Sequence, residues 1–167
     1  MANVHTNEQE LYDRIKNENI SIHPLVWDTL YLYLGDYISG INFITSYYVE
    51  KNEPISIEDS RKILAYTQKI KEIVDKLLHH EKIQDEGERM EKIKHGNMDM
   101  HPIVRELVNH YIGNDVLSIN FIVGDYLDPI DERPILVEHA KRILSRSLSM
   151  SAFLDKFRKA THRDVSF

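Results

Sequence analysis

His110 is the residue whose type and sequence neighbours best suit a chemical reaction. Glu106 precedes it by four residues, Asn114 follows it by four, and Leu117 comes three residues further on. On a helix these residues share one face, which leaves the imidazole at least partly in solvent. An exposed neutral imidazole can attack an aspartyl phosphate on a partner, while Glu106 hydrogen-bonds the ring and sets its tautomer. The alternative is a surface histidine beside a glutamate, with no chemical role.

Other reactive arrangements find little support in this chain. A carboxylate-bridged di-iron site in a helical bundle needs Glu-x-x-His pairs, yet none of the nine His residues has an Asp or Glu three positions before it. His79 and His80 are adjacent, so on a helix their side chains point about 100° apart. His23 and His101 precede prolines, where helix capping explains them better than metal binding. We therefore expect no metal site and no cofactor.

An internal repeat of roughly 55 to 60 residues organises the chain around these candidates. In its first part the two copies are related by an offset of 78 residues, which matches His23 with His101, Gly35 with Gly113, Asn42 with Asn120 and Tyr48 with Tyr126. After the next loop the offset becomes 80 residues, which matches Pro54 with Pro134, Ile55 with Ile135, Ile63 with Ile143 and Asp75 with Asp155.

Apolar residues at steps of three and four predict one short helix and four long ones. The short helix is expected over about 7–18, and the long helices over 24–50, 56–80, 102–127 and 135–160. Prolines 24 and 102 suit the first position of a helix, and Ser56 with Asp59 forms a plausible capping box. The charged stretch 81–97 is expected to be partly helical and to link the copies.

Two helices joined by a short loop form an antiparallel hairpin, and one hairpin cannot bury its apolar stripe alone. The predicted fold is therefore all-α: a four-helix bundle made of two duplicated antiparallel helical hairpins, plus a short N-terminal helix. Both repeats belong to one bundle domain. The expected division is N-terminal helix 1–20, first repeat 21–83, linker 84–100, second repeat 101–160 and tail 161–167.

Repeated small, amide and aromatic residues add detail to this bundle. A mid-helix Gly costs about 1 kcal/mol relative to Ala, so Gly35 and Gly113 indicate either a close helix approach or a local bend. Asn42 and Asn120, two turns further on, predict amides buried on the same face and hydrogen-bonded across the bundle. A set of tyrosines belongs either to the core or to a small-molecule pocket: Tyr31, Tyr33, Tyr37, Tyr47 and Tyr48.

Composition excludes several classes of protein. The net charge of −6, without a basic run that carries aromatics, argues against a nucleic-acid surface. The absence of Cys excludes disulfides and thiolate metal sites. The polar, acidic start does not have the pattern of a secretory signal, and no apolar run approaches the roughly 18 residues of a membrane span. We expect a cytoplasmic protein without nucleic-acid or membrane partners.

The third long helix resembles the phosphoacceptor helix of sensor histidine kinases. The stretch NHYIGNDV, from Asn109 to Val116, is similar to the H-box of that family, in which an acidic, an apolar and a basic residue follow the phosphoacceptor His, and then Asn or Thr, Pro and Leu. Residues 118–127 resemble the rest of that helix, and 143–157 resemble the second helix of the dimerisation and phosphotransfer hairpin. The first repeat has the same shape over 54–83, so the resemblance covers most of 23–160.

The resemblance implies a site and a limit on activity. The family's hairpin dimerises into a four-helix bundle, so two hairpins in one chain imply a fused pseudo-dimer that is a monomer or a further homodimer. His110 would be the phosphoacceptor, and Asn114 would help to position water or phosphoryl oxygens. Tyr111, Gly113 and Asp115 depart from the family's acidic, basic and Pro positions. Nothing resembles the ATP-binding domain, so we expect no autokinase activity and at most phosphotransfer through His110.

Two functions remain open at this point. The first is a signal-transduction protein, acting as a phosphotransfer intermediate or a docking regulator of a two-component system, with a response-regulator receiver domain or a histidine kinase as its partner. The second is a non-catalytic helical adaptor or ligand-sensing bundle. Phosphotransfer requires His110, and only the second repeat offers it, because Leu32 stands at the matching position of the first. A docking regulator would instead depend on the face near Glu106, Asn114 and Asp115.

Overall fold

A computed structural model describes residues 4–18, 20, 22, 24–78 and 101–161. Every regular element in this part of the chain is helical, and it holds no β-strand, which confirms the all-α prediction. The elements are α1 (Val4–Asn17), α2 (Pro24–Asp28), η1 (Thr29–Leu34), α3 (Gly35–Lys51), α4 (Ile57–Leu78), α6 (Pro102–Val108), η3 (Asn109–Gly113), α7 (Asn114–Tyr126) and α8 (Val137–Thr161).

The observed bounds lie within a few residues of the predicted ones because local signals set the helix ends. His101 caps α6, since its Nδ1 accepts a hydrogen bond from the Ile103 N–H at 3.2 Å. The Ser56 hydroxyl accepts the Asp59 N–H at 3.1 Å, as expected from the capping box at the start of α4. Asn52 ends α3 in the left-handed conformation, with φ of 54°. His23, His79, His80 and the predicted linker 84–100 lie outside the described residues.

The two long helices that follow the His-Pro pairs each contain a π-helical segment, which the sequence did not predict. These segments, η1 and η3, are continuous with the α-helices on either side. A π-turn widens the helix because its hydrogen bonds span five residues instead of four. Gly35 directly follows η1, and Gly113 ends η3. A Cβ on Gly35 would have nothing within 4 Å, so at that position the structure argues against the close helix approach.

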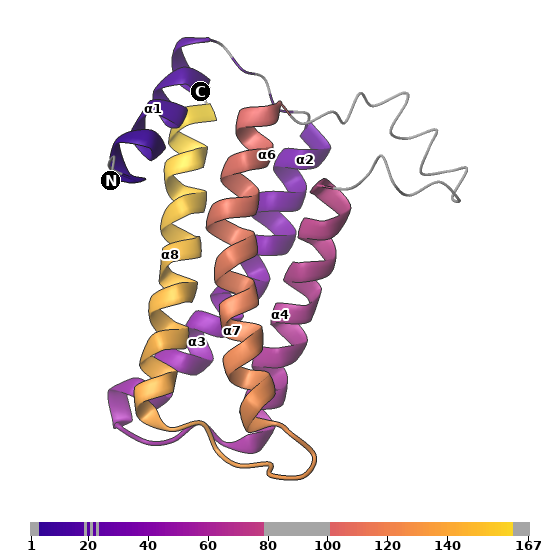
Figure 1. Cartoon of the computed structure of the whole chain (residues 1–167), viewed down its shortest axis with the longest axis vertical. Helices are drawn as coiled ribbons and strands as arrows, with labels where there is room; N and C mark the ends of the chain where they lie inside the picture. The colour runs from indigo at the N-terminus through magenta and orange to yellow at the C-terminus, as the bar shows by residue number, and fades with distance from the viewer. Residues whose placement is uncertain (1–3, 19, 21, 23, 79–100, 162–167) are drawn as a thin grey trace, which may run out of the picture.

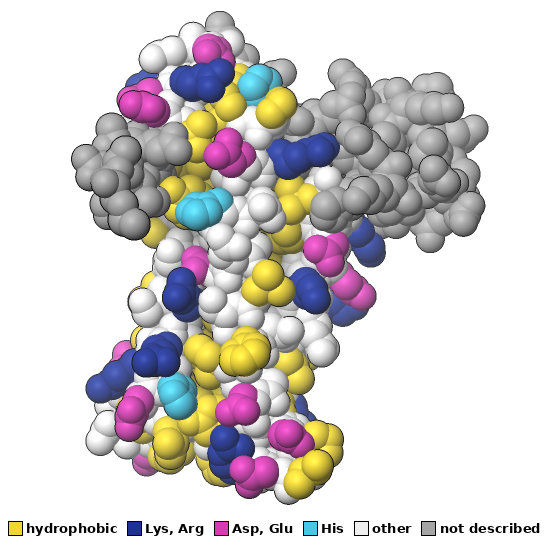
Figure 2. All heavy atoms as spheres, in the orientation of Figure 1, with side chains coloured by type: hydrophobic (Ala, Val, Ile, Leu, Met, Phe, Trp, Pro, Cys, Tyr) yellow, Lys and Arg dark blue, Asp and Glu magenta, His cyan; other side chains and the backbone are white. Residues whose placement is uncertain are grey.

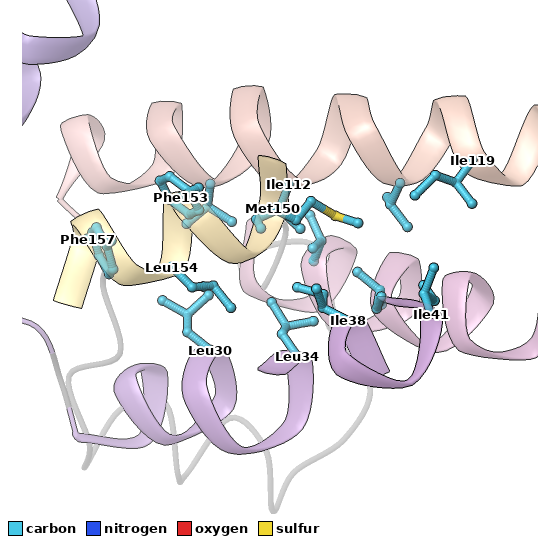
Figure 3. Packing of buried hydrophobic residues seen from close by; sticks show 14 of the residues in the cluster. Leu30, Leu34, Ile38, Ile41, Ile112, Ile119, Met150, Phe153, Leu154 and Phe157 are labelled. Carbon is cyan, nitrogen blue, oxygen red and sulfur yellow. The ribbon is translucent and has the colours of Figure 1, made fainter. Parts of the chain in front are cut away.

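The helices lie side by side (Figure 1), and their buried apolar residues form one core. Helix α3 contacts α4 and α8, α7 also contacts α4 and α8, and α1 covers parts of α8 and α6. In Figure 3, side chains from η1, α3, η3, α7 and α8 point toward one another in this core. Its members include Leu30, Leu34, Ile38, Ile112, Ile119, Met150 and Phe157, each 0–1% exposed. Apolar burial of this kind is the main stabilising contribution to the fold.

The α3–α4 and α7–α8 loops lie at the same end of the molecule (Figure 1), where they meet through a reciprocal backbone contact. The Ile55 N–H donates to the Ile135 carbonyl at 2.9 Å, and the Ile135 N–H donates to the Ile55 carbonyl at 3.0 Å. Both side chains are fully buried. The contact therefore joins two residues that the predicted repeat places at matching positions.

Two polar contacts between helices involve the matching residues Asn42 and Asn120. Asn42 of α3 donates to the Ser151 hydroxyl at 2.9 Å and accepts from the Ser147 hydroxyl of α8. Asn120 of α7 lies 3.2 Å from the Thr67 hydroxyl of α4. Both asparagines are half-buried and bond to another helix, as expected from their repeated position. Polar contacts of this kind favour one register of the packed helices.

Candidate functional site

His110 lies on the solvent side of η3, directly between α6 and α7. Its ring is exposed, and its Nδ1 lies 3.3 Å from the Asn114 Nδ2. The Tyr111 ring meets the imidazole edge-on, with 4.7 Å between ring centroids. Tyr111 in turn stacks on the buried Phe153 of α8, at 5.5 Å. A core aromatic residue therefore supports one side of the imidazole, while the rest of the ring faces solvent.

The structure brings two of the three candidate residues together. Asn114 makes the ring contact that we expected from Glu106. In the part of the chain that the structure describes, the exposed Glu106 carboxylate has no hydrogen bond to the imidazole. Glu106 belongs to α6, His110 belongs to η3, and Asn114 begins the regular helix that follows. Helical spacing alone did not distinguish the two neighbours.

His110 belongs to an exposed stripe that continues along α7. The stripe comprises Glu106, His110, Asn114, Leu117 and Phe121, all of which are solvent-exposed. Leu117 is 50% exposed, and Phe121 is 81% exposed. Exposure of apolar side chains to water is unfavourable. The neighbouring exposed residues Leu117 and Phe121 therefore suggest a surface that another molecule covers.

A groove of about 700 Å³ lies beside this stripe, between α7 and α8. At its floor the Asp115 carboxylate, only 7% exposed as a residue, accepts a hydrogen bond from the Arg146 guanidinium at 3.2 Å. Arg142, one turn earlier on α8, also lines the groove, together with Leu117, Ser118, Phe121, Ile122, Ser145 and Ser149. On the face shown in Figure 2, hydrophobic side chains over α7 lie beside Lys and Arg side chains over α8.

Sequence reasoning did not identify this groove. Two local signals were usable clues: the exposed half of the repeated Ile-Asn-Phe-Ile motif, and the Arg142 and Arg146 pair four residues apart. Neither clue shows that α8 turns its arginines toward α7, since Asp115 and Arg146 are 31 residues apart in the chain. Only the packed helices bring them together.

The end of the molecule that carries the α3–α4 and α7–α8 loops (the loop end) has a second polar cluster. The Tyr48 hydroxyl donates to the Asp59 carboxylate and lies 3.1 Å from the Ser56 hydroxyl. The hydrogen bond from Tyr48, together with nearby Lys62, lowers the pKa of Asp59, and the same bond raises the pKa of Tyr48. These groups cap α4 and tie it to α3, so we assign them a structural role.

The predicted tyrosine set does not form one pocket. Tyr31 is half-buried, donates to the Leu154 carbonyl at 3.1 Å and has its pKa raised by burial. Tyr37 and Tyr48 are half-buried and packed against the core. Tyr33 and Tyr47 are exposed, on the outside of η1 and α3. The set is therefore divided between the edge of the core and the surface.

Among the residues that the structure describes, no three His, Asp or Glu side chains gather in a way that could hold a metal ion. Nor does any helix among them have the length and apolar content needed to cross a membrane.

Comparison with protein-family models, with curated proteins and with solved structures found no match for this chain.

Proposed function

We propose that the described helices form a four-helix bundle of two duplicated hairpins, related by an approximate twofold axis. The reciprocal Ile55–Ile135 bridge supports this, because a twofold axis between two equivalent residues makes each donate a hydrogen bond to the other. The core amides support it further. Asn42 contacts Ser147, Asn120 contacts Thr67, and these two pairs are equivalent under the sequence repeat. Segments η1 and η3 also overlap under the same repeat.

We further propose that this bundle transfers phosphoryl groups in signal transduction, with His110 as the phosphoacceptor. The observation that carries the proposal is the exposed imidazole whose Nδ1 faces Asn114 and whose Nε2 has no hydrogen-bond partner among the described residues. Its partner would be a receiver domain that carries an aspartyl phosphate. The resemblance of NHYIGNDV to a histidine-kinase H-box points to the same chemistry.

The Asn114 contact determines which ring nitrogen is the nucleophile. If the Asn114 amide donates an N–H to Nδ1, the neutral ring carries its proton on Nε2 and cannot attack from there. If the amide is turned, its Oδ1 accepts the Nδ1–H, and Nε2 has a free lone pair. Transfer uses the second arrangement: Nε2 attacks phosphorus, a nitrogen–phosphorus bond forms, the phosphorus–oxygen bond to the aspartyl carboxylate breaks, and the carboxylate leaves.

Direct labelling tests this proposal. The purified protein is incubated with phosphoramidate, and acid-labile phosphate is located by mass spectrometry at neutral pH. We expect phosphate on His110, lost in His110→Gln and retained in Glu106→Gln, because Glu106 does not contact the ring. An unlabelled His110, in an experiment where a known phosphotransfer protein is labelled, would exclude transfer through this residue.

A second candidate function is favoured by the groove between α7 and α8. A helical adaptor that binds a partner or ligand there needs the apolar stripe and the arginines, but it does not need the imidazole. His110→Gln would then leave binding unchanged. The two functions therefore separate on a single variant.

A further inference from the structure

We infer that the groove between α7 and α8 is a binding site for a small aromatic anion, a flat apolar body that carries a carboxylate, sulfonate or phosphate. The inference does not depend on His110. It rests on the volume of the groove, on its two arginines and on the apolar wall of α7.

The size and shape of the groove suit a small molecule. Its volume of about 700 Å³ lies within the range of roughly 300–1,000 Å³ that is typical of ligand sites. One wall is apolar, formed by Leu117, Phe121 and Ile122 of α7. Phe121 is 81% exposed, so its ring face is open for an aromatic group to stack on.

The opposite wall is cationic and has unused donors. Arg142 has no hydrogen bond or ion pair within the described part of the chain. Arg146 has one ion pair, to Asp115, and its side chain is 53% exposed. A guanidinium carries five N–H donors, so both arginines can bind an anion. The hydroxyls of Ser145 and Ser149 line the same wall and add further donors.

The first repeat shows what this surface looks like when it is closed. There, Tyr37 and Tyr66 occupy the positions that match Asp115 and Arg146, and their ring centroids are 5.9 Å apart. The Tyr66 ring lies so close to α3 that a Cβ on Gly40 would be 2.9 Å from it. Aromatic rings therefore fill the space between α3 and α4. The second repeat replaces that aromatic pair with a charged pair and leaves the groove open.

The charge pattern decides between classes of ligand. A cation would meet two guanidinium groups, and a neutral aromatic molecule would leave Arg142 without a partner. Nucleic acid would need a wider basic surface than these two arginines, on a chain with a net charge of −6. An aromatic anion can contact both walls at once, because its ring stacks on Phe121 while its charged group binds the arginines.

Fluorescence titration of the full-length protein with 8-anilinonaphthalene-1-sulfonate tests the inference. We expect saturable binding at one site. The affinity should fall about tenfold in Arg142→Gln and to a similar extent in Phe121→Ala, because the first variant removes a cationic contact and the second an aromatic contact. N-phenyl-1-naphthylamine, which has the same rings without the sulfonate, should bind more weakly and equally to wild type and Arg142→Gln. Inorganic sulfate alone should displace the probe only weakly.

The first repeat supplies matched controls. Phe43, 77% exposed, and Lys62 occupy the positions that match Phe121 and Arg142, so Phe43→Ala and Lys62→Gln should leave probe binding unchanged. The variant Asp115→Asn should strengthen binding severalfold, because it releases Arg146 from its ion pair; a purely structural role of Asp115 would weaken binding instead. Far-UV circular dichroism and a cooperative thermal transition are required of every variant.

The outcomes separate this site from the phosphotransfer proposal. Probe binding that His110→Gln leaves unchanged supports the groove whatever the labelling experiment shows. Equal binding by wild type, Arg142→Gln and Phe121→Ala would overturn the inference, as would an equal loss in Phe43→Ala. Failure of Asp115→Asn to strengthen binding would exclude Arg146 as a contact of the anion.

Discussion

At the scale of single residues, the contact between His110 and Asn114 is the most specific chemical feature of the chain. It is an i to i+4 pair on the surface, which contributes little to stability. Its consequence lies in the tautomer of the ring, because an acceptor on Nδ1 leaves Nε2 free to react.

The tautomer argument predicts the effect of two Asn114 variants. Asn114→Asp places a carboxylate that can only accept, so it holds the proton on Nδ1 and should keep phosphoramidate labelling of His110 at or above the wild-type rate. Asn114→Ala loses this bias and should slow labelling severalfold. Initial rates measured at pH 7.5 test the order. Equal rates in all three proteins would mean that Asn114 does not set the tautomer.

The Tyr48–Asp59 hydrogen bond predicts a pH dependence of stability. A carboxyl whose pKa is lowered in the folded protein stabilises it above the unfolded pKa, near 3.8, and this contribution is lost as pH falls through the folded pKa. Tyr48→Phe removes the donor and should cost about 0.5 kcal/mol at pH 6, because the pair is partly exposed, and less at pH 2.5. Urea unfolding at both pH values measures the difference. A cost that is equal at both would contradict the assignment.

At the scale of elements, the glycines of the two long helices have unequal surroundings. Gly35 has open space around its missing side chain, whereas Gly40 is in contact with the Tyr66 ring. The π-helical segment η1 therefore does not depend on a close helix approach at Gly35.

This difference predicts opposite effects of two alanine substitutions on stability. Gly35→Ala should stabilise the protein by about 0.5–1 kcal/mol, the gain in helix propensity. Gly40→Ala should lose that gain and destabilise by about 1 kcal/mol or more, since the Tyr66 ring must move away from Tyr37. Midpoints of thermal unfolding test the sign. Gly124→Ala, where nothing lies within 4 Å, is the control and should behave like Gly35→Ala.

At the scale of the whole molecule, the proposed duplication makes the two halves equivalent around the loop end. Ile55 and Ile135 are both fully buried and bonded to each other, so their environments are similar. In a pseudo-dimer, the two halves of one chain bury against each other the surface that two separate subunits would otherwise share.

The proposed symmetry predicts matched costs for the two isoleucines and a monomeric protein. Ile55→Ala and Ile135→Ala should each destabilise by about 2–4 kcal/mol and should agree with each other within about 1 kcal/mol. Light scattering should give the mass of a single chain, 19.7 kDa. A twofold larger mass would contradict the expected monomer, and unequal alanine costs would argue against the symmetric bundle.

The sequence by itself determined where the helices of this protein lie and how they end. Apolar residues at helical spacing, His101 before a proline, and Ser56 three residues before Asp59 act within a few residues of the chain, so local reasoning finds them. The repeat also indicated the pairing of Asn42 and Asn120 with other helices, because a polar residue kept at a core position needs a partner.

Only the tertiary structure decided the surroundings of His110 and the presence of the groove. Asn114, not Glu106, lies beside the imidazole, and no local signal predicted the π-helical segment η3 that contains His110. The groove lies where Asp115 of α7 and Arg146 of α8 meet. Side chains 31 residues apart meet only when the helices pack, and the space left between them depends on the volume and charge of both partners.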